Sequence, residues 1–280
     1  MIGTTPDATN RRRLHEQRVD VWVQPHLARR LRGETHPVHD FLFTYYAYRP
    51  AQLRTWHPGY LAEVEERGGV ARHEASLLES RLPLIRQLHT LMSATASRSP
   101  NLGCFGLHEW AMVSKEPLGP EGHRHNWPLR LGQVATDDVV ETHRIGCSHF
   151  DAFRFFTPAA IPLNALQPGR GDRADFEQPG CLHGGMDLYK HAFRLAPLIP
   201  AELVADAFAL AWDIRILDMR AAPYDFTGVT LDPAGQPWTP VRIETAEGKR
   251  DYAEQQRGFA ERGQVIRGRL LEECDRLLNL

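Results

Sequence analysis

Long apolar runs are absent from this sequence. No stretch approaches the roughly 20 apolar residues that a helix needs to cross a bilayer. The first thirty residues are rich in arginine and lack the apolar segment of a secretory signal peptide. We therefore expect a cytoplasmic protein without a membrane partner.

Cysteine is scarce, and positive and negative charges nearly balance. The four cysteines lie far apart and form no C-x-x-C pair, which argues against a disulfide framework and fits a reducing compartment. The formal net charge is −2 at pH 7, whereas most DNA-binding domains are strongly basic. DNA stays open as a partner, but the net charge does not support it. The expected partner is a small-molecule substrate, such as one that contains a nucleobase.

Three widespread catalytic motifs are missing as well. The sequence has no G-x-S-x-G elbow, no Walker phosphate loop and no G-x-G-x-x-G that follows a strand. These absences argue against a serine hydrolase of the elbow type, a P-loop nucleotidase and an enzyme with a dinucleotide-binding fold of the usual pattern.

Apolar residues recur at helical spacing along most of the chain. This pattern predicts a mainly α fold, organised as a single helical domain over residues 1–280. We expect the clearest helices over 74–92, 186–195 and 202–220, and another from Lys249 onward.

Strands and long loops are expected at only a few places. Short strands are predicted around 144–155 and 240–244. Proline and glycine cluster near 115–128 and 167–185, which predicts long loops there. A long loop inside a compact domain is often functional.

The segment Gly146–Phe156 carries functional side chains at alternate positions. Cys147, His149 and Asp151 would share one face of a strand, because successive side chains of a strand point to opposite sides. Such a polar face needs a partner or a ligand, since unpaired polar groups are costly to bury.

Three interpretations of this segment stay open. In the first, it joins a second C-x-H pair, Cys181 and His183, to form a Cys2His2 zinc site. In the second, imidazole and carboxylate groups bind iron or zinc, or act as an acid and a base. In the third, the polar residues are hydrogen-bonded core residues, with Asp151 paired to Arg154.

Two other segments carry similar groups among apolar residues. The tetrapeptide L-H-E-W places His108 and Glu109 between large apolar side chains, where burial raises a carboxylate pKa and lowers an imidazole pKa. His183 and Asp187 flank two glycines, which allow close approach to a ligand. We expect the three segments to converge in one pocket that excludes water.

Asp187 and His191 lie four positions apart in the sequence and would share one helical face. This spacing resembles part of the ligand set of haem-oxygenase-like di-iron oxidases, for which Glu109 is a further candidate. The cofactor is unknown from the sequence, with a divalent metal, iron or zinc, as the candidate. The candidate metal ligands are His108, His149, Asp151, His183, Asp187 and His191.

Aromatic and basic side chains are candidates for substrate binding. Tyr45 and Tyr46 precede Arg49, so the rings can stack on a base while the guanidinium meets a phosphate or carboxylate. The expected substrate-binding residues are Tyr45, Tyr46, Arg49, Trp110, Phe153 and Arg154.

Charged residues also alternate with apolar ones inside the expected buried helix 202–220. Arg215 can form an internal ion pair with Asp213 or with Asp218. Alternatively, Asp218 and Arg220 line the same cavity as Asp187.

Four blocks of the sequence, 39–50, 101–113, 147–157 and 179–190, resemble an actinobacterial family commonly labelled 3-methyladenine DNA glycosylase. The resemblance extends along most of the chain. It implies hydrolysis of the N-glycosidic bond to a damaged purine, with the base flipped into an aromatic pocket and an Asp or Glu activating water. Glu109 or Asp151 would then be the base, and His149 would orient it.

Two alternatives belong to other classes. One is a metal-dependent oxygenase or hydrolase of a small metabolite, with non-haem iron or zinc. Its metal would lie among His149, Asp151, His183, Asp187 and Glu109. The other is a non-catalytic binding protein whose histidine-lined cavity holds a ligand or a structural metal.

Overall fold

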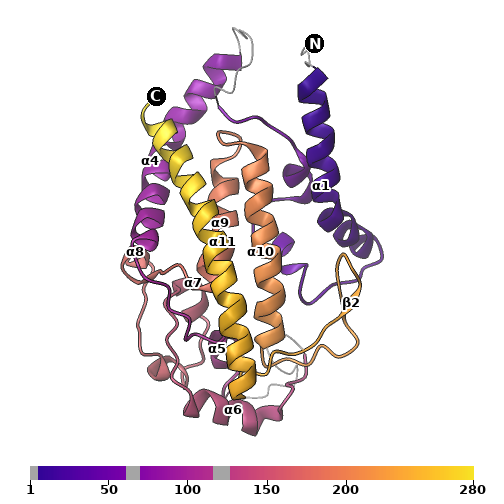
Figure 1. Ribbon diagram of the computed structural model, residues 1–280, viewed down its shortest axis with the longest axis vertical. Coiled ribbons are helices and arrows are strands. Elements are labelled where there is room, and N and C mark those ends of the chain that lie inside the picture. The colour runs from indigo at the N-terminus through magenta and orange to yellow at the C-terminus, as the bar shows by residue number, and fades with distance from the viewer. Residues whose placement is uncertain (1–5, 61–69, 116–126) are drawn as a thin grey trace.

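The computed structural model describes residues 6–60, 70–115 and 127–280. Within these ranges most of the chain is helical, and the named strands pair in one two-stranded sheet. The expected mainly α fold with a few short strands is therefore confirmed. Figure 1 shows the long helices side by side, with several shorter ones gathered near the lower end of the molecule.

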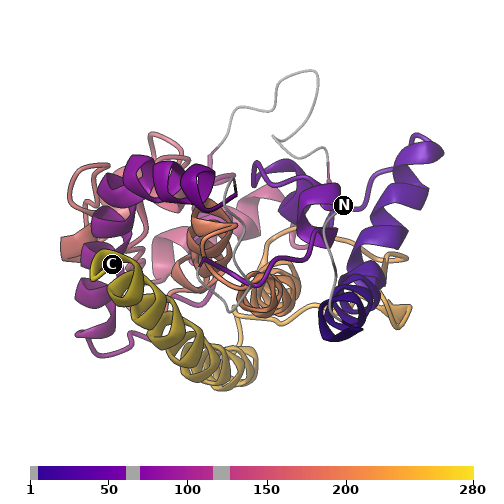
Figure 2. The ribbon, with the colours of Figure 1, turned by 90° about the horizontal axis from the view of Figure 1, so that it is seen from above.

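Three helices form the centre of the fold: α9 (Leu182–Leu195), α10 (Ala201–Ala221) and α11 (Ala246–Leu278). α10 packs against both of the others and is buried around most of its circumference, because it carries apolar residues on nearly every side. α4 (Val70–Ala96) packs against α11, and α1 (Pro6–Leu31) lies beyond α10 (Figure 2).

Shorter elements connect these helices. They are α2 (Phe41–Thr44), α3 (Pro50–Arg54), α5 (Leu107–Ala111), α6 (Gly132–Thr142), α7 (Phe150–Phe153), η1 (Ile161–Leu163) and α8 (Arg173–Phe176). One large apolar core includes residues from α1 to α11. A smaller apolar cluster surrounds the hairpin of β1 (Thr230–Leu231) and β2 (Gln236–Pro237).

The start of α9 brings this helix close to α10. Cys181 is the N-cap residue, and its sulfur accepts a hydrogen bond from the Gly184 N–H at 3.4 Å. A Cβ added at Gly185 would lie only 2.6 Å from Cδ1 of Ile214 on α10, so a larger residue would push the helices apart. The glycine pair thus lets polar side chains on α9 reach those on α10.

The prediction of a strand over 144–155 is wrong. Ile145 forms a single bridge with Asn164, and α7 begins at Phe150. The Asn164 side chain accepts from the Cys147 N–H at 2.7 Å and donates to the Cys147 carbonyl at 2.9 Å. These backbone groups are therefore already paired and cannot join a strand ladder.

Other expected boundaries also differ. The strand predicted over 240–244 is absent from the structure, and the hairpin lies before it in the sequence. The segment 167–185 is not one long loop, because it contains α8 and the first turn of α9. Most of the loop predicted over 115–128 lies outside the described residues, and the single-domain organisation stays a prediction.

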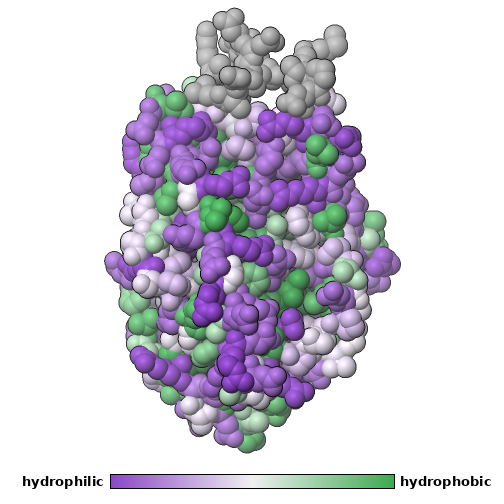
Figure 3. Space-filling model, viewed as in Figure 1, coloured by the Kyte–Doolittle hydropathy of each residue, from purple (hydrophilic) through white to green (hydrophobic). Residues whose placement is uncertain are grey.

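The face over α11 is mainly hydrophilic, with small and separate hydrophobic patches (Figure 3). Within the described ranges, no helix combines the length and the apolar composition that crossing a membrane requires. The cytoplasmic location stays a prediction.

Candidate functional site

Three side chains from α5, α9 and α10 meet inside the helical core. They are His108, His183 and Asp218, which we call the His2Asp group. One potential ligand atom from each lies within 4.8 Å of the other two. His108 Nε2 is 3.0 Å from Asp218 Oδ1, and the rings of His108 and His183 stand nearly perpendicular, with centroids 4.4 Å apart.

The pKa values of the three groups are set by burial and by their contacts with one another. Burial alone would lower the pKa of His108, but contact with Asp218 raises it well above the usual value. Burial, together with the neighbouring His108, lowers the pKa of His183 well below the usual value. Burial alone would raise the pKa of Asp218, but His108 lowers it. The group therefore combines an ion-paired imidazole with a neutral one.

Arg215 holds the carboxylate side of the His2Asp group. Its Nη1 lies 2.9 Å from Asp218 Oδ2 and 3.6 Å from Glu109 Oε1. All three side chains are buried. The internal ion pair of this helix is therefore the one between Arg215 and Asp218, which was one of the two predicted pairs.

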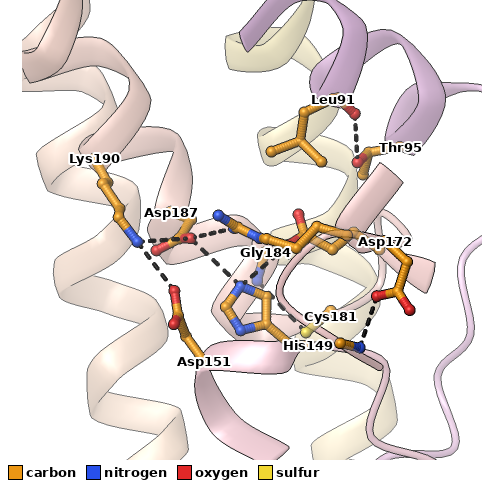
Figure 4. A network of polar contacts seen from close by, with 12 residues as sticks. Leu91, Thr95, His149, Asp151, Asp172, Cys181, Gly184, Asp187 and Lys190 are labelled. Carbon is orange, nitrogen blue, oxygen red and sulfur yellow. Dashed lines mark hydrogen bonds and ion pairs between the residues drawn. The ribbon is translucent and has the colours of Figure 1, made fainter. Parts of the chain in front are cut away.

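A second polar cluster lies one turn further along α9, and Figure 4 shows part of it, with His149, Asp151, Asp187 and Lys190 labelled. This Asp187 network consists of Tyr46, His149, Asp151, Arg173, Glu177, Asp187 and Lys190. Asp187 accepts a hydrogen bond from the Tyr46 hydroxyl at 3.3 Å and another from Arg173 Nη2 at 2.8 Å. Arg173 Nε donates to Glu177 Oε1 at 2.5 Å. Lys190 Nζ lies 3.1 Å from Asp151 Oδ2 and 3.5 Å from Asp187 Oδ2.

Neighbouring side chains keep the carboxylates of Asp187 and Asp151 ionised. Burial alone would raise the pKa of Asp187, but His149 and Lys190 lower it well below the usual value. Burial would likewise raise the pKa of Asp151, and Lys190 lowers it. These paired carboxylates therefore resist protonation near neutral pH.

His149 connects the two clusters. Its ring centroid is 5.4 Å from that of His183, and its Nε2 lies 3.4 Å from Asp187 Oδ2 and 3.6 Å from Glu177 Oε1. The side chain is buried, yet neither ring nitrogen has a hydrogen-bond partner of good geometry. Glu109 Oε2 is also buried without a partner. Unpartnered polar atoms in a core are costly, so they indicate where an ion, a water or a ligand would bind.

The structure thus brings together the three segments that were expected to converge. His108 and Glu109 come from α5, His149 from the extended residues before α7, and His183 and Asp187 from α9. His149 and its neighbours reach the cluster without the predicted strand, because the chain remains extended up to the start of α7.

Three expected site residues lie apart from these clusters. His191 is buried on α9, where burial lowers its pKa to about 3, but it belongs to neither cluster. Trp110 is fully buried, and its Nε1 donates to the Ala221 carbonyl at 2.8 Å, so it is a core residue. Arg49 is exposed at the start of α3.

The remaining expected substrate residues lie near Asp151, at the outer edge of the Asp187 network. Tyr45 is 38% exposed, and Phe153 is partly buried. Arg154 is exposed, with its Nε 3.5 Å from Asp151 Oδ1. The predicted pair of Asp151 and Arg154 therefore forms, although Lys190 is the closer cation.

The Cys2His2 interpretation finds no support in the geometry. The Cys147 thiol contacts the carbonyl of His149 at 3.6 Å, and the Cys181 sulfur caps α9. Among the described residues, the groups compact enough to hold a metal ion contain no cysteine.

His36, His39 and Asp232 form another compact group of potential ligands. His36 Nε2 lies 2.8 Å from the Thr230 carbonyl, and His39 Nε2 accepts from the Asp232 N–H at 2.9 Å. The Asp232 carboxylate accepts from Arg29 at 2.6 Å. These hydrogen bonds connect the hairpin to α1 and to the segment before α2, although His39 Nδ1 is buried without a partner.

Sequence reasoning missed Arg173 and Glu177 and did not name Asp218 as a ligand. Arg173 and Glu177 lie in a segment that was expected to be a loop, and their i, i+4 spacing was the available signal. Asp218 was marked by its position inside an apolar helix, where a carboxylate needs a buried partner.

Comparison with known proteins does not identify the site. No family model, curated protein or solved structure matches the chain. The resemblance to the glycosylase family therefore stays a prediction.

Proposed function

We propose that the chain is a metal-dependent enzyme, an oxygenase or a hydrolase, that uses iron or zinc to act on a small molecule. Its metal ligands would be His108, His183 and Asp218. The observation that carries this proposal is the compactness of the His2Asp group, whose ligand atoms lie within 4.8 Å of one another. Two imidazoles and one carboxylate suit non-haem iron and catalytic zinc, and they leave coordination positions open for a substrate.

Neighbouring residues support a reaction site rather than a purely structural one. The His149 ring lies beside the carboxylates of Asp187 and Glu177, with both ring nitrogens unpartnered, so an imidazole is available there to contact a substrate or water. Arg215 holds Asp218 in a fixed orientation, which a metal-ligating carboxylate requires. A bound metal would supply Lewis-acid polarisation of substrate or water.

The geometry supports hydrolysis of a nucleobase glycosidic bond less well than it supports a metal-dependent reaction. A general base works best when its pKa lies near the working pH, but Lys190 lowers the pKa of Asp151. Glu109 Oε1 lies 3.6 Å from the Arg215 guanidinium, so one of its two oxygens already faces a cation. The glycosylase activity stays a prediction from the resemblance.

Metal content tests the proposal. Protein purified without a metal-affinity tag is analysed for iron and zinc, and metal-depleted protein is titrated with Fe2+ in the absence of oxygen and with Zn2+. We expect close to one ion per chain. His183→Gln should remove most of this binding, whereas His191→Gln, a buried histidine on the same helix but outside the group, should preserve it.

Two results would overturn the proposal. One is a folded wild-type chain that binds neither ion stoichiometrically. The other is equal metal binding by His183→Gln and the wild type. Metal-free protein that releases a base from alkylated DNA would also overturn it and would support the glycosylase prediction.

A further inference from the structure

A cleft lies beside the His2Asp group, on the other side of the chain segment that leads into α5. Its volume is about 740 Å³, within the range of roughly 300–1,000 Å³ usual for small-molecule pockets. One wall is formed by residues within 101–107 and another by residues within 142–146. Glu244, just before α11, and Lys249, in its first turn, complete the charged part of the lining.

The segments that line the cleft also carry or lead to the buried histidines. Phe105 and Leu107 line the cleft, whereas Cys104 and His108 of the same segment face each other in the interior, with Sγ and Nδ1 4.0 Å apart. Gly146 lines the cleft, and the buried residues that follow it lead to His149. A ligand in the cleft would therefore lie one layer of residues from the candidate metal ligands.

The cleft carries positive charge that is not compensated. Arg144 is exposed, and neither it nor Lys249 forms an ion pair with any residue that the structure describes. Glu244 does not offset them, because both of its oxygens accept from Arg130, at 2.7 and 2.9 Å. An anionic group would find two free cations here.

Phe105 supplies an apolar surface between these cations and the core. The Lys249 Nζ lies 5.9 Å from the centre of its ring. Phe105 has a φ of 49°, which is uncommon for a residue other than glycine. Strained backbone of this kind often occurs at functional sites, and here it fixes the position of an aromatic ring at the cleft.

We propose that this cleft binds a small anion with a flat apolar part, its carboxylate or phosphate held by Arg144 and Lys249 and its flat part resting on Phe105. Because a layer of residues separates the cleft from the candidate metal ligands, any link of this assignment to the metal-dependent reaction rests on the proposed function. As a binding site, it rests on the cleft alone.

Calorimetric titration with phenyl phosphate, benzoate and phenol tests the proposal. We expect saturable binding of at least one of the two anions and none of phenol, because phenol lacks the charge. The anion that binds more tightly identifies which acidic group, phosphate or carboxylate, the cleft prefers. The double variant Arg144→Gln/Lys249→Gln should bind that anion at least about tenfold more weakly than the wild type. The control Arg250→Gln/Arg257→Gln changes the net charge equally at exposed positions of α11 outside the cleft and should bind within about twofold of the wild type.

Absence of saturable anion binding would overturn the proposal, as would equal loss in the two double variants. Much tighter binding of a single-stranded DNA oligonucleotide, with a steep salt dependence, would overturn the assignment to a small molecule. Failure of the proposed function is distinguishable, because a chain that binds no metal but still binds the anion as expected retains the cleft as a binding site.

Discussion

Two ion pairs in this structure have nearly the same length but very different surroundings. Arg215 and Asp218 approach to 2.9 Å with side chains only 6% and 0% exposed, and Arg262 and Asp213 approach to 2.8 Å with side chains 49% and 44% exposed. If burial rather than distance determines the effect of losing the cation, Arg215→Met should be far more damaging than Arg262→Met. Methionine preserves an unbranched apolar chain in both variants.

The magnitudes follow from what each variant leaves behind. Arg215→Met leaves the buried carboxylates of Asp218 and Glu109 without the guanidinium, and removal of one partner of a buried pair costs about 3–5 kcal/mol. His108 stays 3.0 Å from Asp218, so we expect a value in the lower half of that range. Arg262→Met removes an exposed pair, which contributes about 0–1 kcal/mol.

Urea unfolding of both variants and the wild type, in buffer with a metal chelator, measures these free energies. The chelator prevents a bound cation from replacing the lost charge. We expect Arg215→Met to lose at least about 2 kcal/mol more than Arg262→Met. A difference below about 1 kcal/mol, with similar urea slopes, would refute the conclusion that Arg215 compensates buried negative charge.

Two further predictions concern other parts of the fold. Gly248→Ala should lower the free energy of unfolding by several kcal/mol, because its new Cβ would overlap the Arg242 backbone carbonyl. Gly258 lies on the same helix and has open space around a new Cβ. In the same urea assay, Gly258→Ala should therefore be neutral or stabilising by about 0.5–1 kcal/mol. For Asp40, burial alone would raise the pKa, but contact with His26 lowers it, so its stabilisation is present above about pH 4 and is lost as the pH falls further. Asp40→Asn should therefore be less stable than the wild type at pH 7, and the gap in melting temperature should narrow below pH 4.

Helices with a strong apolar period were the most predictable part of the fold. The pattern over 202–220 corresponds to α10, and the seam from Lys249 corresponds to most of α11. The predicted strand over 144–155 does not form, because Asn164, distant in sequence, pairs with the backbone of Cys147. A contact of this kind is invisible to a local pattern.

The candidate site was predictable in its residue types but not in its partners. Isolated histidines and acids among apolar residues marked His108, His183 and Asp187, because burial without a partner is costly. Asp213 and Asp218 are five residues apart and so point about 140° away from each other around the helix. Only the packing of α9 and α11 on α10 determines that Asp218 faces inward and that Asp213 meets the exposed Arg262.

The Asp187 network allows a test in which the sign of a pH effect distinguishes charge from packing. Arg173 joins two buried carboxylates, lying 2.8 Å from Asp187 and 2.5 Å from Glu177. Arg173→Gln leaves Asp187 with Lys190 at 3.5 Å, whereas Glu177 keeps His149 at 3.6 Å and the electrostatic attraction of the buried Arg267. The variant should therefore lose about 3–5 kcal/mol at pH 7.

Acid should stabilise this variant but not the wild type. In the wild type, burial alone would raise the pKa of Asp187, but its neighbours lower it well below the usual value, so this carboxylate adds no stability as the pH falls from 7 to 5. In Arg173→Gln the buried Glu177 carboxylate has lost its closest cation, so protonation removes a poorly compensated negative charge. Urea unfolding of this variant should therefore show higher stability at pH 5 than at pH 7. Arg98→Gln is the matched control, because among the described residues Arg98 donates to the backbone carbonyls of Ala94 and Glu177 and to no carboxylate. Equal pH responses of the two variants would mean that Arg173 acts through packing rather than through its charge.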